Sequence, residues 1–310
     1  MHNIFGKDGN TDVLIFGLDT GKLNGEFTVG ALTVIPDFNL EEYLEGYDET
    51  DIGFIVDRAK YGKYEPKFGS ESLQFSPMVD DVCLIPFRLF KRGWLSAMSV
   101  SPVVKVDGVE TRCELDITRH LFGQIWADDD SYSITAEEIG LIQQKYQQLL
   151  AMPKGYLEMA LRRFSRCYKY IQHSEYAGTS ELDDYWIDLV IALESITSSE
   201  ERSIKANMAR RIAILLGKDN AGRKQIDTRV REIYKQRCSI VHGDEKDIVD
   251  DRTHEKRFVE AETLRTLVRD TINACINLLL ESSTSLVDIS GNRKKLPDLI
   301  DESVSKEAKS

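Results

Sequence analysis

Two different hydrophobic periods divide the chain. Up to about residue 125, short apolar and β-branched runs alternate with Asp, Gly, Asn and Pro, which is typical of β-strands. These runs cover residues 13–16, 27–29, 32–35, 82–87 and 95–106. Asp107 and Gly108 separate two such runs and predict a hairpin turn, because both residues tolerate positive φ. Residues 41–47 predict a short helix within a loop.

The spacing of apolar residues becomes helical after about residue 135. Thr135 and Glu138 form the pattern of a capping box, which predicts a helix that ends before Pro153. Five further helices are predicted around residues 157–171, 180–196, 204–216, 226–242 and 258–278. The helix capped by Thr179 and Ser180 is apolar almost all round, so we expect it at the centre of a bundle.

These patterns predict an α+β fold with two domains. Residues 1–130 would form a mostly antiparallel β domain with a sensing or regulatory role, and residues 131–282 an all-α bundle. The remaining residues, 283–310, are polar and of mixed charge, which predicts a mobile tail.

Several absences narrow the class of protein. The N-terminus lacks the pattern of a signal peptide, and no apolar run approaches the roughly 18 residues that a membrane span needs. The five cysteines are scattered without a C-x-x-C pair, which favours reduced thiols in the cytoplasm over a disulfide framework or a zinc site. No phosphate loop, dinucleotide fingerprint or metalloprotease motif is present, so we expect neither a cofactor nor a metal.

The net charge of −12 is unevenly distributed along the chain. Residues 1–140 carry 12 Lys or Arg and 25 Asp or Glu, whereas the rest of the chain is close to neutral. Residues 200–237 hold 11 basic and 5 acidic residues. The acidic average therefore argues against nucleic-acid binding only for the N-terminal part, and the basic segment predicts contacts with phosphates.

One residue breaks the apolar stripe of the predicted helix at 226–242. Ile226, Val230 and Ile233 share a face whose next position is Arg237. A charge on a core-facing stripe is typical of a functional or paired residue. His242 follows five residues later, and Gly243 ends the helix.

This R-x4-H segment resembles the motif of the HEPN ribonucleases. Residues 188–196 resemble the central helix of that family, and residues 209–217 together with 233–243 resemble its Apea-like branch. The resemblance covers roughly residues 140–282. It implies an HEPN helical bundle that acts as a symmetric homodimer, with a role in prokaryotic antiviral defence or abortive infection and a phage-derived trigger at the N-terminal domain.

The resemblance implies a metal-independent endoribonuclease that cuts tRNA or other cellular RNA and leaves a 2′,3′-cyclic phosphate and a 5′-hydroxyl. Its catalytic residues would be Arg237 and His242. Histidine transfers protons near neutral pH, and arginine offers a fork of donors for phosphate oxygens. On an ideal helix the two side chains lie about 140° apart. They meet only if the helix frays near Val241, or if two chains contribute to one site.

Other residues are candidates for supporting roles. Cys238 and Ser239 follow the arginine, where many relatives carry a small polar residue, and Glu194 on the central helix is a partner for Arg237. A purely structural pair of Arg237 with Glu194 is the alternative interpretation. His242 alone would merely complement the helix dipole. The candidates for RNA contacts are Arg210, Arg211 and Lys235.

Two other functions stay open at this point. The first is a non-catalytic HEPN module for dimerisation or RNA binding, because cysteine at position 238 is a weak hydrogen-bond partner. The second, which the absence of a phosphate loop makes weaker, is an effector that responds to a small nucleotide.

Overall fold

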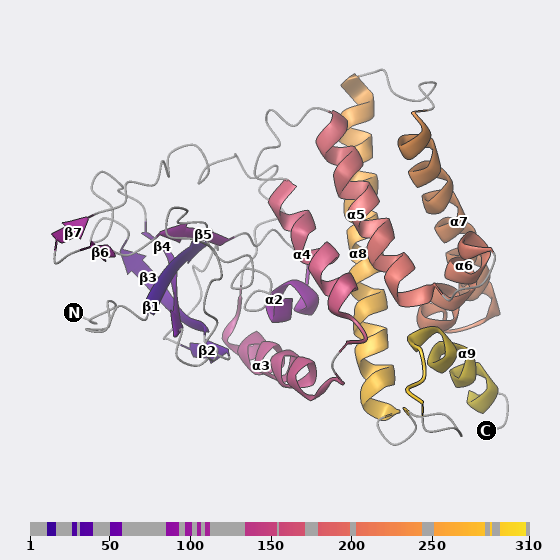
Figure 1. Ribbon diagram of the computed structural model, residues 1–310, viewed down its shortest axis with the longest axis horizontal. Coiled ribbons are helices and arrows are strands. Elements are labelled where there is room, and N and C mark those ends of the chain that lie inside the picture. The colour runs from indigo at the N-terminus through magenta and orange to yellow at the C-terminus, as the bar shows by residue number, and fades with distance from the viewer. Residues whose placement is uncertain are drawn as a thin grey trace. The chain divides into compact units, whose positions relative to one another are not determined.

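A computed structural model describes residues 11–16, 27–29, 32–39, 50–57, 85–92, 97–100, 104–106, 109–111, 134–153, 155–170, 179–198, 203–243, 251–282, 286 and 292–307. The chain divides into two compact units, Met1–Gln147 and Gln148–Ser310. The first unit holds short strands, one short helix and most of another helix, and the second is built of helices (Figure 1).

Backbone hydrogen bonds pair the strands of the first unit in antiparallel fashion. The strands are β1 Thr11–Phe16, β2 Phe27–Val29, β3 Leu32–Asn39, β4 Thr50–Asp57, β5 Ala97–Val100, β6 Val104–Val106 and β7 Val109–Thr111. Five of them pair in the order β2-β3-β4-β1-β5, and β6 pairs with β7. Val106 lies opposite Val109, so the hairpin predicted at residues 107–108 is confirmed by its strands.

The predicted α+β class, with an N-terminal mostly antiparallel β domain, is wrong. Helices make up 84% of the residues whose side-chain burial the structure describes, and these residues belong to eight helices, the segments beside them and a single short strand, β2. Among these residues, Val29 is the one buried apolar side chain that comes from a strand. All the others belong to helices or to the segments beside them. The fold is therefore mostly α, because the helices provide the core.

Two further sequence predictions are corrected. The run at 82–87, predicted as a strand, contains the start of helix α2 Ile85–Phe90, where Pro86 occupies the first turn and needs no amide donor. Within the predicted tail, Leu296–Glu307 forms helix α9, which buries Leu296, Leu299 and Ile300. The predicted helix at residues 41–47 lies outside the described residues.

Helix α3 Ala136–Ala151 begins at the predicted capping box. The Glu138 carboxylate accepts a hydrogen bond from the backbone N–H of Thr135 at 2.9 Å. The same carboxylate pairs with the ammonium group of Lys91 at 2.7 Å. This local pairing satisfies a donor at the helix start and fixes the first turn.

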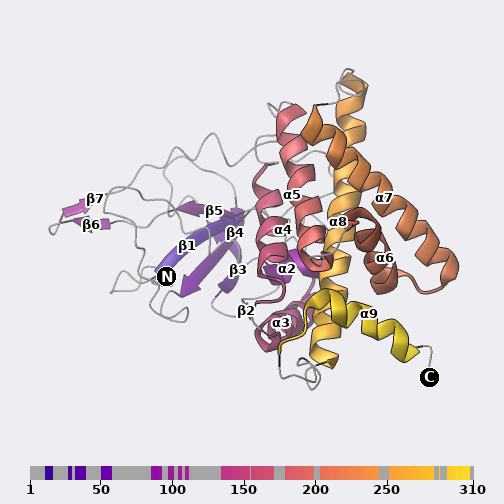
Figure 2. The same cartoon turned by 45° about the vertical axis from the view of Figure 1, so that its right-hand side comes forward.

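The second unit is a bundle around one buried helix. Its helices are α4 Glu158–Tyr170, α5 Thr179–Thr197, α6 Ile204–Leu216, α7 Asn220–His242, α8 Asp251–Glu281 and α9. Helix α5 packs against α4, α6, α7, α8 and α9, and Figures 1 and 2 both show it running beside α8. Its side chains at Leu189, Leu193 and Ile196 are fully buried, which confirms the central helix predicted from its apolar composition.

Polar side chains inside the bundle satisfy one another. The Tyr185 hydroxyl donates to the Glu262 carboxylate at 2.8 Å, and Arg265 pairs with the same carboxylate. The Arg265 guanidinium also lies over the ring of Tyr168, 4.8 Å from its centre. Burial raises the pKa of Tyr185 well above its ordinary value, so this hydroxyl stays a donor. The network ties α4, α5 and α8 together.

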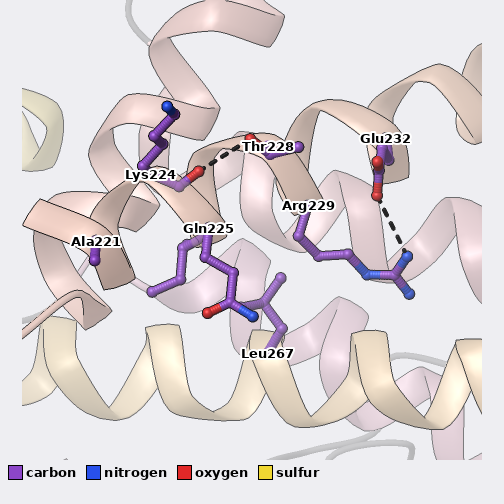
Figure 3. Close-up of a pocket in the computed structure, with 8 residues that line it drawn as sticks. Ala221, Lys224, Gln225, Thr228, Arg229, Glu232 and Leu267 are labelled. Carbon is purple, nitrogen blue, oxygen red and sulfur yellow. Dashed lines mark hydrogen bonds and ion pairs between the residues drawn. The ribbon is translucent and has the colours of Figure 1, made fainter.

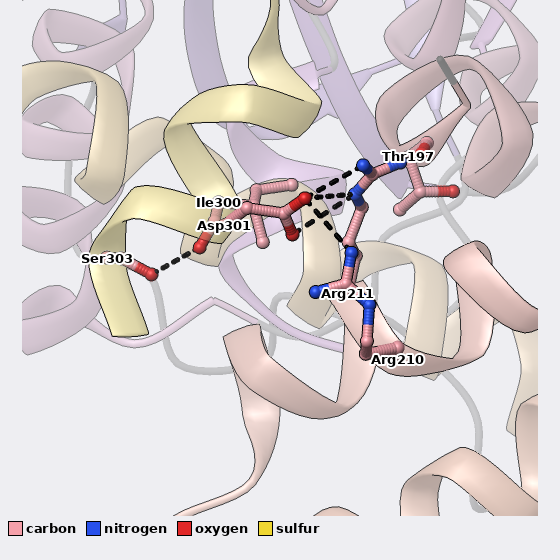
Figure 4. Close-up of polar contacts among 6 residues, drawn as sticks. All are labelled: Thr197, Arg210, Arg211, Ile300, Asp301 and Ser303. Atoms are coloured by element: carbon pink, nitrogen blue, oxygen red, sulfur yellow. Dashed lines mark hydrogen bonds and ion pairs between the residues drawn. The ribbon is translucent and has the colours of Figure 1, made fainter. Parts of the chain in front are cut away.

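Arg211 anchors α9 to the bundle (Figure 4). Its side chain is almost fully buried, and its guanidinium donates to the Asp301 carboxylate at 2.8 Å and to the backbone oxygen of Thr197 at 2.7 Å. The pair therefore joins the end of α5, the middle of α6 and α9. Removing either partner would leave a buried polar or charged group without its hydrogen bonds and would therefore destabilise the fold.

Replacing Arg211 with methionine should lower the free energy of unfolding by about 3 kcal/mol, because the Thr197 oxygen and Asp301 lose a charged donor. The matched variant Arg210→Met removes an exposed cation at the neighbouring position and should cost less than about 0.5 kcal/mol. Urea unfolding followed by circular dichroism measures both values. Equal losses in the two variants would contradict the anchoring role of Arg211.

The anchor also predicts a pH dependence. Partial burial raises the pKa of Asp301, but hydrogen bonds from Arg211 and Arg210 outweigh it and hold this pKa below its ordinary value of 3.8. A lowered pKa stabilises the fold above 3.8, and this contribution is lost as pH falls through the folded value. The difference in unfolding free energy between wild type and Asp301→Asn should therefore be largest near neutral pH and shrink in acid. A difference that grows in acid would contradict the pairing.

Candidate functional site

Helix α7 carries the R-x4-H segment and is continuous through it. The helix begins after Asp219, whose carboxylate accepts a hydrogen bond from the Gly222 amide at 2.7 Å. It ends at Gly243, which adopts a left-handed conformation with φ 65° and donates its N–H to the Ile240 oxygen at 3.3 Å. His242 is the last helical residue. Fraying near Val241, which would bring Arg237 and His242 together in one chain, therefore does not occur.

Arg237 occupies the face that the apolar stripe predicts. Val230 and Ile233 on the same stripe are buried, and Arg237 is half-buried. Its guanidinium lies 5.9 Å from the ring centre of Tyr234, within reach of a weak cation–π contact. Its Nε is buried and has no hydrogen-bond partner.

Glu194 on α5 lies close enough to Arg237 for their charges to interact. Burial raises the pKa of Glu194, and the positive charge of Arg237 partly lowers it. No ion pair within 4.0 Å joins the two residues in the described part of the chain. Burial also raises the pKa of Tyr234, with further contributions from Glu194 and Cys238. The predicted supporting residues Glu194 and Cys238 thus gather around Arg237, although Glu194 does not hold the guanidinium in a direct salt bridge.

The structure does not bring His242 to this cluster. His242 is exposed at the end of α7, and an ideal helix places it about 140° around the axis and about 7.5 Å along it from Arg237. Ser239 is half-buried, and its backbone oxygen accepts a bond from Gly243. The two catalytic candidates of one chain are therefore held apart by an intact helix.

The three candidate RNA contacts differ in exposure. Lys235 is exposed on α7. Arg210 is exposed, but its guanidinium pairs with Asp301 at 3.0 Å. Arg211 is buried and saturated by Asp301 and Thr197, so its predicted role in RNA binding is wrong (Figure 4). A sequence pattern of adjacent arginines cannot show that one of them points into the core.

A cavity of about 770 Å³ lies along α7, with one wall contributed by Leu267 of α8 (Figure 3). Its lining includes Gln225, Ile226 and Arg229 of α7 but neither Arg237 nor His242. The sequence offered only one signal for it, the excess of basic residues between positions 200 and 237. Its place depends on how α7 and α8 pack, which residue spacing within one helix does not reveal.

In the described ranges, no three His, Cys, Asp or Glu side chains are grouped so that they could hold a metal ion. None of the helices in those ranges has the length and apolar character that crossing a membrane requires.

The environment of Glu194 predicts the effect of removing its neighbouring charge. In Arg237→Gln the burial that raises the pKa of Glu194 remains, and the positive charge that lowers it is lost, so the pKa should rise further. Carboxyl carbon NMR titration measures this pKa. Arg231→Gln is the control, since Arg231 lies on the same helix and pairs with Asp227 at 2.6 Å. An unchanged Glu194 pKa in Arg237→Gln would contradict the proximity of the two charges.

Comparisons with known proteins provide no evidence about the family or function of this chain. No family model, no curated protein and no solved structure matches this sequence.

Proposed function

We propose that the protein is a metal-independent endoribonuclease whose active site forms between two copies of the chain. In this composite site, Arg237 of one protomer works with His242 of the partner subunit. The single observation that carries the proposal is the unbroken helix α7, which keeps the half-buried, core-facing Arg237 apart from the exposed His242 at its end. A two-fold axis near the end of α7 would place Arg237 of each chain beside His242 of the other chain.

The end of α7 is exposed to solvent at Val241, His242 and Gly243, and Val241 is 48% exposed. Gly243 adds no side chain there. A second copy of α7 could therefore approach the histidine closely and cover Val241.

The two side chains supply the chemistry of RNA cleavage in complementary ways. The 2′-hydroxyl must lose a proton to attack the phosphorus, and the 5′-oxygen must gain one to leave. The imidazole of His242 can perform either transfer. The guanidinium of Arg237 can bind two phosphate oxygens at once and stabilise the charge of the phosphorane. The products would be a 2′,3′-cyclic phosphate and a 5′-hydroxyl.

The wider context of the proposal rests on the resemblance to the Apea-like HEPN branch. It places the protein in the cytoplasm, in antiviral defence or abortive infection, with tRNA or other cellular RNA as substrate. It also gives the N-terminal unit the role of sensing a phage-derived trigger.

A non-catalytic module for dimerisation or RNA binding is the second candidate. The observation that favours it is Cys238, which follows the arginine and interacts with the neighbouring Tyr234. A thiol is a weaker donor and acceptor than the hydroxyl or amide of a Ser or Asn, and would orient a substrate less firmly. Such a module would retard RNA in a gel without producing new ends.

The variants His242→Ala and Arg237→Ala should each lower cleavage of tRNA or total RNA in the presence of EDTA by about 100-fold or more. End analysis of wild-type products should show cyclic phosphates and 5′-hydroxyls. His242 is exposed, so its variant should keep the helical circular dichroism of the wild type.

Arg237→Lys serves as the conservative control for the half-buried arginine. It keeps the charge and loses the planar fork, so activity should stay well below wild type while folding is preserved. Cleavage that persists in both alanine variants would contradict the assignment of these residues. Binding without cleavage by the wild type would favour the non-catalytic module.

A further inference from the structure

The cavity along α7 is open to solvent and lies beside, and not within, the R-x4-H motif. Helix α7 buries only Val230 and Ile233 among the residues described in it, so much of its remaining surface stays accessible. Ile226 of α7 and Leu267 of α8 give the cavity apolar surface. A space of about 770 Å³ is within the range of small-molecule and nucleotide sites.

Polar groups stand around this apolar surface. In Figure 3 the Gln225 amide extends from α7 towards α8 and lies near Leu267. The Thr228 hydroxyl donates to the backbone oxygen of Lys224 at 3.0 Å, so its oxygen remains able to accept a hydrogen bond. An amide with both donor and acceptor atoms beside apolar side chains is suited to the edge of a nucleobase.

Two cations lie at the cavity, and neither is held firmly. Lys224 is exposed. Arg229 contacts Glu232 at 3.7 Å, and both side chains are substantially exposed. An exposed pair at that distance contributes little to stability, so Arg229 can exchange Glu232 for a phosphate that binds its fork. By contrast, Arg231 outside the cavity is held by Asp227 at 2.6 Å.

The cavity and the R-x4-H motif lie along the same helix. Lys224 is on the same side of α7 as His242, 18 residues later, whereas Arg229 lies about 140° around the axis from His242 and about 80° from Arg237. Arg229 is about 20 Å from His242 along the helix axis. A single strand of RNA bound at the motif could therefore reach the cavity with nucleotides several positions from the cut.

We propose that this cavity binds nucleotides that flank the cleavage site of a single-stranded RNA. A base would rest on Ile226 and Leu267 with its edge at Gln225, and Lys224 and Arg229 would bind the adjoining phosphates. The inference rests on the proposed ribonuclease function and adds a requirement to it. The substrate needs an unpaired segment that extends beyond the scissile phosphate on one side.

The test measures RNA binding separately from cleavage. In a His242→Ala background, Lys224→Ala/Arg229→Ala should bind a fluorescent single-stranded oligonucleotide at least about tenfold more weakly. The slope of log affinity against log salt should also fall by about 0.7 for each cation removed. Arg231→Ala is the matched control for Arg229→Ala, because it removes an arginine of the same helix that lies outside the cavity, and its affinity should stay within about twofold.

Substrate length provides the second measurement. With His242 restored, the double variant should cleave long unpaired substrates more slowly and short ones at the wild-type rate. Equal loss for Arg231→Ala, or no loss in the double variant, would overturn the cavity assignment. Uridine monophosphate is tested separately. If it binds in a way that depends on Lys224 and Arg229 while oligonucleotide affinity does not, the cavity is a site for a free nucleotide, which also overturns the proposal.

The outcomes separate the two proposals. A protein that binds RNA through Lys224 and Arg229 but cuts none would contradict the ribonuclease function, and the cavity would then be an RNA-binding site without a neighbouring cleavage site. A protein whose cleavage requires His242, but whose RNA affinity does not depend on Lys224 or Arg229, would support the ribonuclease function and contradict the cavity assignment.

Discussion

The continuity of α7 is the constraint on which the functional argument depends. Backbone hydrogen bonding persists to His242, and the left-handed Gly243 ends the helix immediately afterwards. Helical geometry then fixes Arg237 on the inner face near Glu194 and His242 on the outer surface. Any reaction that uses both side chains on one phosphate must therefore recruit the second side chain from another copy of the chain.

The rest of the helical unit holds α7 in that position. Helix α7 packs mainly on α6 and also on α5, which supplies Glu194. Helix α6 is in turn fixed by the buried Arg211, which pairs with Asp301 of α9 and with the last turn of α5. The Arg211 guanidinium thus has a structural role in the bundle, because Asp301 and the Thr197 oxygen satisfy its donors.

The helical part of the fold could be predicted from sequence because its signals are local. The capping pair of Thr135 and Glu138, the apolar stripe of α7 and the terminal Gly243 all act within a few residues. The fold class was mistaken because β-branched runs indicate strands but not how much of the core those strands form. Arg211 was misassigned for a similar reason: its acceptor Asp301 lies 90 residues away, and only tertiary packing brings them together. Helix α9 and the cavity at Leu267 likewise depend on contacts between distant segments.

The most direct test of the composite site mixes two inactive proteins, Arg237→Ala and His242→Ala. If each site takes its arginine from one chain and its histidine from the other, subunit exchange creates heterodimers with one complete site. Random exchange makes half of the dimers heterodimers, and each heterodimer has one intact site and one site that lacks both residues. The mixture should therefore recover about a quarter of the wild-type cleavage rate. A mixture that stays as inactive as either variant alone, after exchange has been verified, would contradict a site shared between two chains.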